Sequence, residues 1–169
     1  MKNEHAISNE AQIARRGQFA IWSELVKLRL TTMVLITTAM GFYLASANAF
    51  DWMMLLHALF GTGLLACGAA ALNQYLEKEF DAKMPRTANR PIPAGHIRPE
   101  RALLAGGALA VIGLVYLAVQ VNPITSVIGA VTLVSYIAVY TPLKRVTSLN
   151  TIVGAIPGAL PPLMGWTAA

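Results

Sequence analysis

The sequence predicts an all-α fold, a polytopic transmembrane helical bundle, and three observations lead to that fold class. The chain has 169 residues, of which 56% are hydrophobic and 12% are charged, against about 25% charged in an average soluble domain. The charged residues leave five uncharged stretches, and each has about the 20 residues that a helix needs to cross a bilayer. These features exclude a soluble enzyme, and the single cysteine excludes a disulfide scaffold. The five stretches without Lys, Arg, Asp or Glu are 30–50, 53–76, 102–121, 123–143 and 149–169.

The basic residues indicate how the five predicted spans are oriented. All 13 Lys and Arg residues lie before residue 30, between 76 and 102, or between 143 and 149. With five spans these segments fall on one side of the bilayer, and the positive-inside rule places them in the cytoplasm. Topology therefore accounts for the net charge of +5. We expect the chain to have a lipid bilayer as its partner and its basic segments to bind no nucleic acid.

The predicted domain organisation is a cytoplasmic N-terminal segment, 1–29, followed by a membrane domain, 30–169. No apolar core precedes residue 30, so the segment is not a signal peptide. Its three glutamates break the acid-poor pattern of a mitochondrial transit peptide, and we expect a bacterial inner membrane. Residues 13–28 mix apolar and basic side chains, which is typical either of an interfacial amphipathic helix or of a solvated leader that orients the first span.

The last predicted span, 149–169, is unusual because it contains three prolines within residues 157–162. Each proline removes a backbone donor, so we expect this helix to be kinked or interrupted. Irregular backbone at membrane depth is tolerated only beside protein or a water-filled cavity, which predicts a cavity next to this span. Gly154 and Gly158 form a G-x-x-x-G pattern, which we interpret as close helix packing.

A polar stripe is predicted where the second span reaches the cytoplasm. Asn73, Glu77 and Asp81 are four residues apart and share one helix face over about 12 Å, whereas Glu79 points away. Hard oxygen ligands at this spacing suit Mg²⁺, which uses one or two carboxylates together with water and phosphate. A helix that merely becomes polar as it leaves the membrane would explain Glu79. It explains Asn73, one turn inside the span, less well.

Basic residues follow this stripe and recur after the fourth span. Pro85 and Pro91 stop a regular helix, so Arg86 and Arg90 are expected on a constrained loop beside the carboxylates. Guanidinium groups bind phosphate oxygens through paired hydrogen bonds. On the same side of the membrane the fourth span ends in Tyr140, Lys144 and Arg145. The combination predicts a site for a metal ion and a diphosphate.

These residues carry a resemblance to a known family. Asn73-x-x-x-Glu77-x-x-x-Asp81 and Tyr140-x-x-x-Lys144 resemble the signatures of the UbiA-type intramembrane prenyltransferases. The longer strings 73–91 and 140–166 resemble the haem-farnesylating branch of that family. Members of the family have about nine helices and a second Asp-rich segment that nothing here matches. The resemblance therefore implies that the five spans are the N-terminal part of such a domain, and that residues 1–169 alone are inactive.

The resemblance also implies an activity: transfer of farnesyl from farnesyl diphosphate to the vinyl group of protohaem IX (haem B), giving haem O. Mg²⁺ bound with the diphosphate would be the cofactor, and haem A synthase or terminal oxidase assembly factors are possible partners. The residues implied as catalytic are Asn73, Glu77, Asp81 and Lys144, of which the first three would also hold the metal. The residues implied as diphosphate-binding are Arg86, Arg90, Tyr140, Lys144 and Arg145.

Two alternatives stay open at this level. A sister intramembrane prenyltransferase acting on a quinone precursor or a lipid would share the same stripe. A non-enzymatic membrane scaffold, whose basic loops bind anionic lipid, explains the positive charge. The scaffold gives no reason for Asn73, Glu77 and Asp81 to share a helix face.

Overall fold

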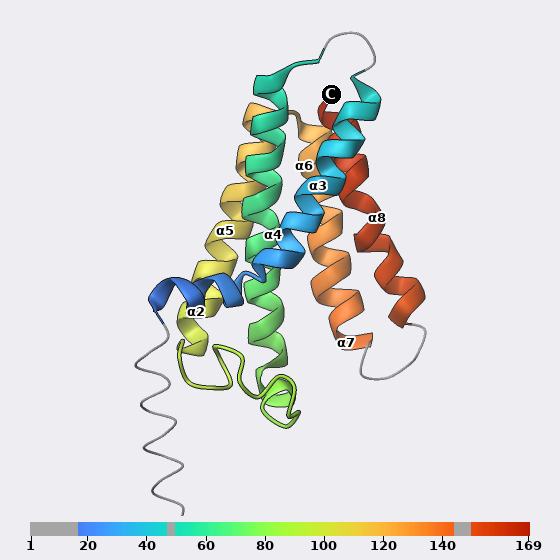
Figure 1. The fold of residues 1–169 in the computed structure, drawn as a ribbon. Coiled ribbons are helices and arrows are strands. Elements are labelled where there is room, and N and C mark those ends of the chain that lie inside the picture. The colour runs from blue at the N-terminus through green and yellow to red at the C-terminus, as the bar shows by residue number, and fades with distance from the viewer. Residues whose placement is uncertain (1–16, 47–49, 144–149) are drawn as a thin grey trace, which may run out of the picture.

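The computed structural model describes residues 17–46, 50–143 and 150–169, and these residues form helices joined by turns (Figure 1). The all-α prediction is confirmed. The helices are α2 (Gln18–Leu25), α3 (Leu28–Ala45), α4 (Trp52–Asp81), α5 (Pro99–Gln120), α6 (Pro123–Val134), the π-helical η1 (Ser135–Tyr140), α7 (Thr141–Leu143) and α8 (Asn150–Ala168).

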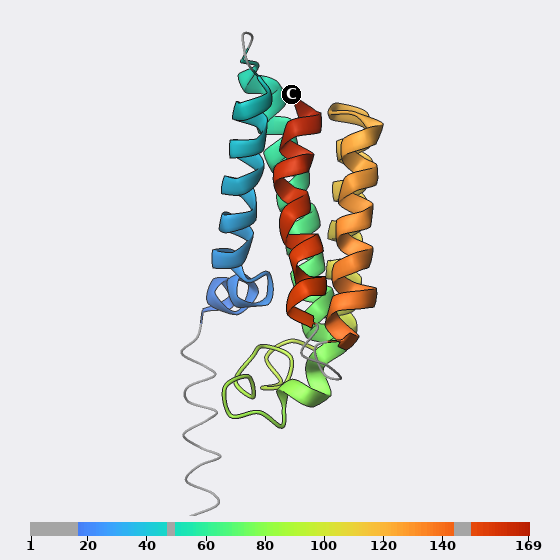
Figure 2. The ribbon, with the colours of Figure 1, turned by 90° about the vertical axis from the view of Figure 1, so that its right-hand side faces the viewer.

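The long helices run alternately up and down in a bundle, as short connections require. Helix α4 packs most extensively on α5, and α8 packs against α3 and α6. Figure 2 shows α8 between α3 and α6, with α4 behind them. Helix α2, the turns after α4, α7 and the start of α8 all lie at one end of the bundle (Figure 1). The described parts of the basic segments therefore share one end, as the sequence predicts.

Four helical stretches are long and apolar enough to cross a membrane: Leu28–Ala45, Trp52–Asp81, Pro99–Gln120 and Pro123–Leu143. They correspond to the first four predicted spans. Helix α8, at 19 residues, covers the fifth predicted span, whose crossing of the bilayer stays a prediction. Of the two expected effects of the prolines, an interruption is wrong, because α8 is one continuous helix through all three of them; a kink stays a prediction. The prolines remove backbone hydrogen bonds from α8, and packing against α3 and α6 stabilises the helix instead.

Polar side chains cap two helices at the opposite end of the bundle. The Oδ1 atom of Asp51 accepts hydrogen bonds from the backbone N–H groups of Met53 and Met54, at 2.8 and 3.0 Å, so it caps α4. Asn122 caps α6 in the same way, accepting from Thr125 N at 2.8 Å. The Asn122 side chain also donates to Thr167 O at 2.7 Å, which ties this turn to α8.

Glycines determine how closely two pairs of helices approach. A Cβ atom at Gly68 would lie 2.7 Å from the backbone of α5 at Gly106 and Ala110. A Cβ at Gly165 of α8 would overlap the carbonyl oxygen of Thr38 in α3. Backbones can touch at these contacts only because no side chain stands between them.

Helix α2 lies across the end of the bundle rather than along it (Figure 1). Its Ile21 and Leu25 are buried in an apolar cluster with Ala71 of α4 and Ile97 of the loop before α5. Phe19 on the other face is 82% exposed. Residues 18–25 are therefore part of the fold and not a solvated leader.

Candidate functional site

The predicted stripe on α4 is present and faces the bundle interior. Helix α4 is regular to Asp81, so the spacing of four residues places Asn73, Glu77 and Asp81 on one side. Their exposed fractions are 1%, 2% and 5%, whereas Glu79 is exposed. The separation of Glu79 from the stripe is confirmed. Three side chains with oxygen atoms that are hard metal ligands are thus buried at the end of the bundle where the basic segments lie.

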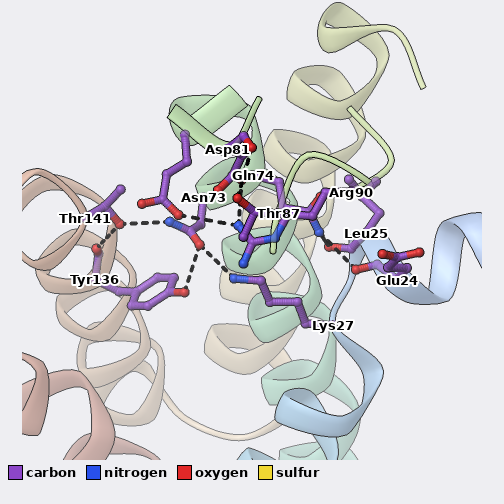
Figure 3. A network of polar contacts seen from close by, with 11 residues as sticks. Glu24, Leu25, Lys27, Asn73, Gln74, Asp81, Thr87, Arg90, Tyr136 and Thr141 are labelled. Carbon is purple, nitrogen blue, oxygen red and sulfur yellow. Dashed lines mark hydrogen bonds and ion pairs between the residues drawn. The ribbon is translucent and has the colours of Figure 1, made fainter. Parts of the chain in front are cut away.

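Asn73 is the centre of a hydrogen-bond network that joins three parts of the chain (Figure 3). Its Oδ1 accepts from Lys27 Nζ at 2.8 Å and from the Tyr136 hydroxyl at 3.2 Å. Its Nδ2 donates to Thr141 Oγ1 at 3.2 Å. The amide is fixed with its oxygen toward the ammonium group, an orientation that also suits a bound cation. We call Lys27, Asn73, Glu77, Asp81, Arg90, Tyr136 and Thr141 the Asn73 cluster.

Lys27 reaches Asn73 because the chain turns sharply between α2 and α3. Its backbone is left-handed, with φ 49° and ψ 56°, a conformation that costs a non-glycine residue about 1–2 kcal/mol. Gln74 holds the preceding turn, since its Nε2 donates to the carbonyl oxygens of Glu24 and Leu25 at 2.9 Å each. Sequence reasoning did not find Lys27 or Gln74, although both lie near segments that it singled out.

Arg90 closes the other side of the cluster. Its guanidinium lies 2.6 Å from Asp81 Oδ2 and 3.9 Å from Glu77 Oε2. The turns after α4 bring it back, and the Thr87 hydroxyl holds them by donating to the Asp81 carbonyl oxygen at 3.0 Å. The prediction that Arg90 sits beside the carboxylates is confirmed. Arg90 and the two carboxylates form a charged group that is largely withdrawn from solvent.

The π-helical segment η1 supplies the aromatic side of the site. The rings of Tyr136 and Tyr140 stack with centroids 5.7 Å apart and planes 15° from parallel. Thr141 Oγ1 donates to the Tyr136 carbonyl oxygen at 2.8 Å. Gly154 makes room for the stack, since a Cβ there would lie 2.7 Å from the Tyr140 ring. Short π-helical stretches often occur at functional sites.

A cavity of about 750 Å³ opens beside the Asn73 cluster. At the cluster end it is lined by Lys27, Asn73, Tyr136, Tyr140 and Asn150, and deeper in the bundle by Thr62, Leu65, Gly158, Pro161 and Met164. The predicted cavity beside 149–169 is confirmed, and its polar residues are concentrated at one end. Gly158 does not pack closely on another helix, because a Cβ there meets no described atom within 4 Å. Among the described residues, the packing interpretation of the G-x-x-x-G pattern therefore holds for Gly154, which contacts the Tyr140 ring, and is wrong for Gly158.

The sequence matches the UbiA prenyltransferase family over residues 34–169. The chain belongs to the UbiA prenyltransferase family. Among similar curated proteins, the Solibacter usitatus "Protoheme IX farnesyltransferase" is 47% identical over 86% of this chain and 53% of its own length. The human "Protoheme IX farnesyltransferase, mitochondrial" is 46% identical over 88% of this chain and 33% of its own length. The chain thus spans about half, or less, of the relatives it matches.

One solved structure shares the fold of this prenyltransferase-family chain. It is described as "Structural and mechanistic insights into the biosynthesis of Digeranylgeranylglyceryl phosphate synthase in membranes". The TM-score is 0.77 at 20% identity, and the match covers 87% of this chain and 52% of that one. The two chains therefore share the same arrangement of helices.

The donor set of the Asn73 cluster fits a magnesium ion that binds together with phosphate. In residues 17–46, 50–143 and 150–169, no three His, Cys, Asp or Glu side chains come together. The cluster instead offers two carboxylates and one amide oxygen, all buried. Mg²⁺ commonly takes one or two carboxylates and completes its shell with water and substrate phosphates. The positively charged groups of Lys27 and Arg90 already contact these oxygens, so the cluster favours positive charge at this position.

The remaining predicted site residues are placed as follows. Tyr140 lines the cavity at the cluster end. Arg86 is exposed and, within the described part of the chain, makes no hydrogen bond or ion pair with the Asn73 cluster. Lys144 and Arg145 lie outside the described residues. Tyr136 was missed, although its position four residues before Tyr140 was a usable signal.

Proposed function

We propose that the complete protein containing this chain transfers the farnesyl group of farnesyl diphosphate to the vinyl group of haem B, giving haem O. The observation that carries this proposal is the buried Asn73 cluster, whose Lys27, Asn73 and Tyr136 line the polar end of a largely apolar cavity, with Glu77, Asp81 and Arg90 behind them. Such a shape suits a molecule with a charged head and an apolar tail. The names of the relatives support haem B as the acceptor.

The diphosphate would bind at the Asn73 cluster. Lys27 and Arg90 reach into it, and Arg86, Lys144 and Arg145 are proposed to neutralise the outer oxygens. Mg²⁺, held by Asn73, Glu77 and Asp81, would supply charge stabilisation to the departing diphosphate. Since Lys27 and Arg90 contact the same oxygens that would bind the metal, we propose that they move onto the diphosphate when it arrives with Mg²⁺.

In the proposed reaction the allylic C–O bond breaks and its electron pair leaves with the diphosphate. Electrostatic stabilisation of developing charge is commonly the largest catalytic contribution, and the basic residues provide it here. The rings of Tyr136 and Tyr140, which line the cavity beside the cluster, would stabilise the farnesyl cation through their π faces. The vinyl π electrons of haem B then form the new C–C bond. Water adds to the resulting cation and a proton is released, which gives the hydroxyethylfarnesyl side chain.

The test of this function is a haem and quinone analysis of cells that lack the gene. We expect haem O to be absent, quinone levels to be normal, and the complete gene to restore haem O. Loss of a prenylated quinone or lipid with normal haem O would instead assign the protein to a sister prenyltransferase.

Lys27 gives a prediction that separates substrate binding from metal binding. Replacing Lys27 by Met removes the ammonium group that contacts Asn73 Oδ1 at 2.8 Å. The same ammonium group is proposed to move onto the diphosphate, and a hydrogen bond to a charged group is worth about 1.5–3 kcal/mol. Without that bond we expect the KM for farnesyl diphosphate to rise about tenfold or more in the complete protein. The Mg²⁺ concentration for half activity should not rise. A raised Mg²⁺ requirement at unchanged KM would show that Lys27 only holds Asn73 in place.

We further propose that the end of the bundle carrying the Asn73 cluster faces the cytoplasm of a bacterium, with the chain in the inner membrane. The positive charge of the loops at this end supports that orientation. Reporter fusions after Arg98 and Lys144 should read cytoplasmic, and fusions at Asn48 and Asn122 should read periplasmic. A periplasmic signal at Arg98 would invert the topology and place the site away from cytoplasmic isoprenoid diphosphates.

A further inference from the structure

The cavity has a definite floor. Thr62 lies eleven residues before Asn73 on α4, about 16 Å away along the helix axis. Leu65, nearly one turn closer to Asn73 on α4, and Met164 of α8 also line the cavity; they are 4% and 1% exposed and pack with Ala110 and Leu117 in one apolar cluster. Within the described residues the cavity therefore runs from the Asn73 cluster to this packed layer, and its length is fixed by side chains.

One position on the cavity wall leaves space that a side chain would fill. Gly158 lines the cavity, and an added Cβ meets no described atom within 4 Å. The other cavity glycine, Gly154, has the Tyr140 ring 2.7 Å from such an atom. Gly165 lies two turns further along the same face of α8, and there the helix already touches α3. A Cβ at Gly158 thus points into open space, whereas one at Gly165 meets α3, and the absent side chain at Gly158 leaves the cavity wider at mid-depth.

Thr62 is the deepest residue of α4 that lines the cavity. It is 2% exposed, and its hydroxyl oxygen is itself buried and has no hydrogen-bond partner within residues 17–46, 50–143 and 150–169. Thr62 therefore contributes its packed shape to the floor and presents no accessible polar atom to the cavity.

We propose that the cavity measures the length of the prenyl chain. The space at Gly158 admits the third isoprene unit, and Thr62 with Leu65 and Met164 excludes a fourth. This rests on the proposed function for the diphosphate site. A farnesyl chain has twelve carbons in line and, with C–C bonds of about 1.5 Å in a zigzag, extends about 14 Å. A geranylgeranyl chain, four carbons longer, extends about 19 Å and passes Thr62.

The test measures binding of geranyl, farnesyl and geranylgeranyl diphosphates to the purified complete protein with Mg²⁺, and uses inorganic diphosphate as a probe of the head-group site alone. Gly158→Leu should weaken farnesyl binding at least tenfold relative to geranyl and leave inorganic diphosphate binding unchanged. Gly158→Ala should shift the ratio in the same direction by less. Leu65→Ala, which shortens a side chain of the packed floor, should raise geranylgeranyl binding severalfold relative to farnesyl.

The matched control is Gly107→Leu on α5, where an added Cβ also meets no described atom within 4 Å but which does not line the cavity. It should leave all ratios at their wild-type values. Wild-type ratios in both Gly158 variants, or an equal shift in Gly107→Leu, would overturn the proposal. If the prenyl-diphosphate binding ratios shift as expected but the activity assay yields no prenylated haem, the proposed acceptor is overturned. The proposal on chain length would then remain supported.

Discussion

Replacing Asp81 by alanine in the complete protein is expected to lower turnover at least a hundredfold, and Glu77→Ala should do the same. Removing one group that stabilises transition-state charge commonly costs a factor of about 10²–10³. Both carboxylates are buried on one face of α4 and contact Arg90. Either substitution therefore removes a proposed metal ligand and leaves that guanidinium with one carboxylate fewer. Turnover is measured as haem O formed per enzyme in membranes.

Glu79→Ala is the matched control, because it removes a carboxylate from the same turn of α4 that is exposed and faces away from the stripe. It should be nearly silent. Asp81→Asn guards against misfolding, since it keeps the shape of the side chain and loses only the charge. Normal turnover in Asp81→Asn and Glu77→Ala, at normal protein levels, would remove these carboxylates from the site.

The α4 stripe could be predicted because a long regular helix converts a spacing of four residues into one face. Lys27 could not, because its position depends on a left-handed turn that no glycine marks and on Gln74 bonding to carbonyl groups of α2. Such contacts arise only when distant segments pack. Arg90 was predictable because it is only nine residues from Asp81 in sequence.

Glycine spacing was a poor guide to helix contacts. The G-x-x-x-G pattern of Gly154 and Gly158 lies on the cavity wall, whereas Gly41 and Gly165, which form no such pattern, mark where α3 and α8 touch. The sequence cannot distinguish a glycine that admits a neighbouring backbone from one that leaves a space, since both need only the absence of a Cβ. Which role applies is decided by the distance between helices.

The contact of α3 with α8 gives the second large expected effect. Gly165→Leu places a side chain where even a Cβ would overlap the Thr38 carbonyl oxygen. Overpacking a well-packed core costs about 1–3 kcal/mol when side chains can adjust. Here the obstacle is backbone, so we expect a loss at or above the top of that range. In the complete protein this should appear as a strongly lowered melting temperature in detergent and reduced folded protein in the membrane.

Gly158→Leu is the matched comparison, because it adds the same side chain to the same helix, two turns earlier on the same face. It should melt close to the wild type, since leucine favours a helix more than glycine does and fills open space. Gly41→Ala, which meets the Pro162 backbone from the α3 side, should destabilise the fold in the same way as Gly165→Leu. Equal melting temperatures for Gly165→Leu and Gly158→Leu would contradict the close contact. They would also contradict the difference between open space at Gly158 and close contact at Gly165, and the proposed selection of prenyl length depends on that difference.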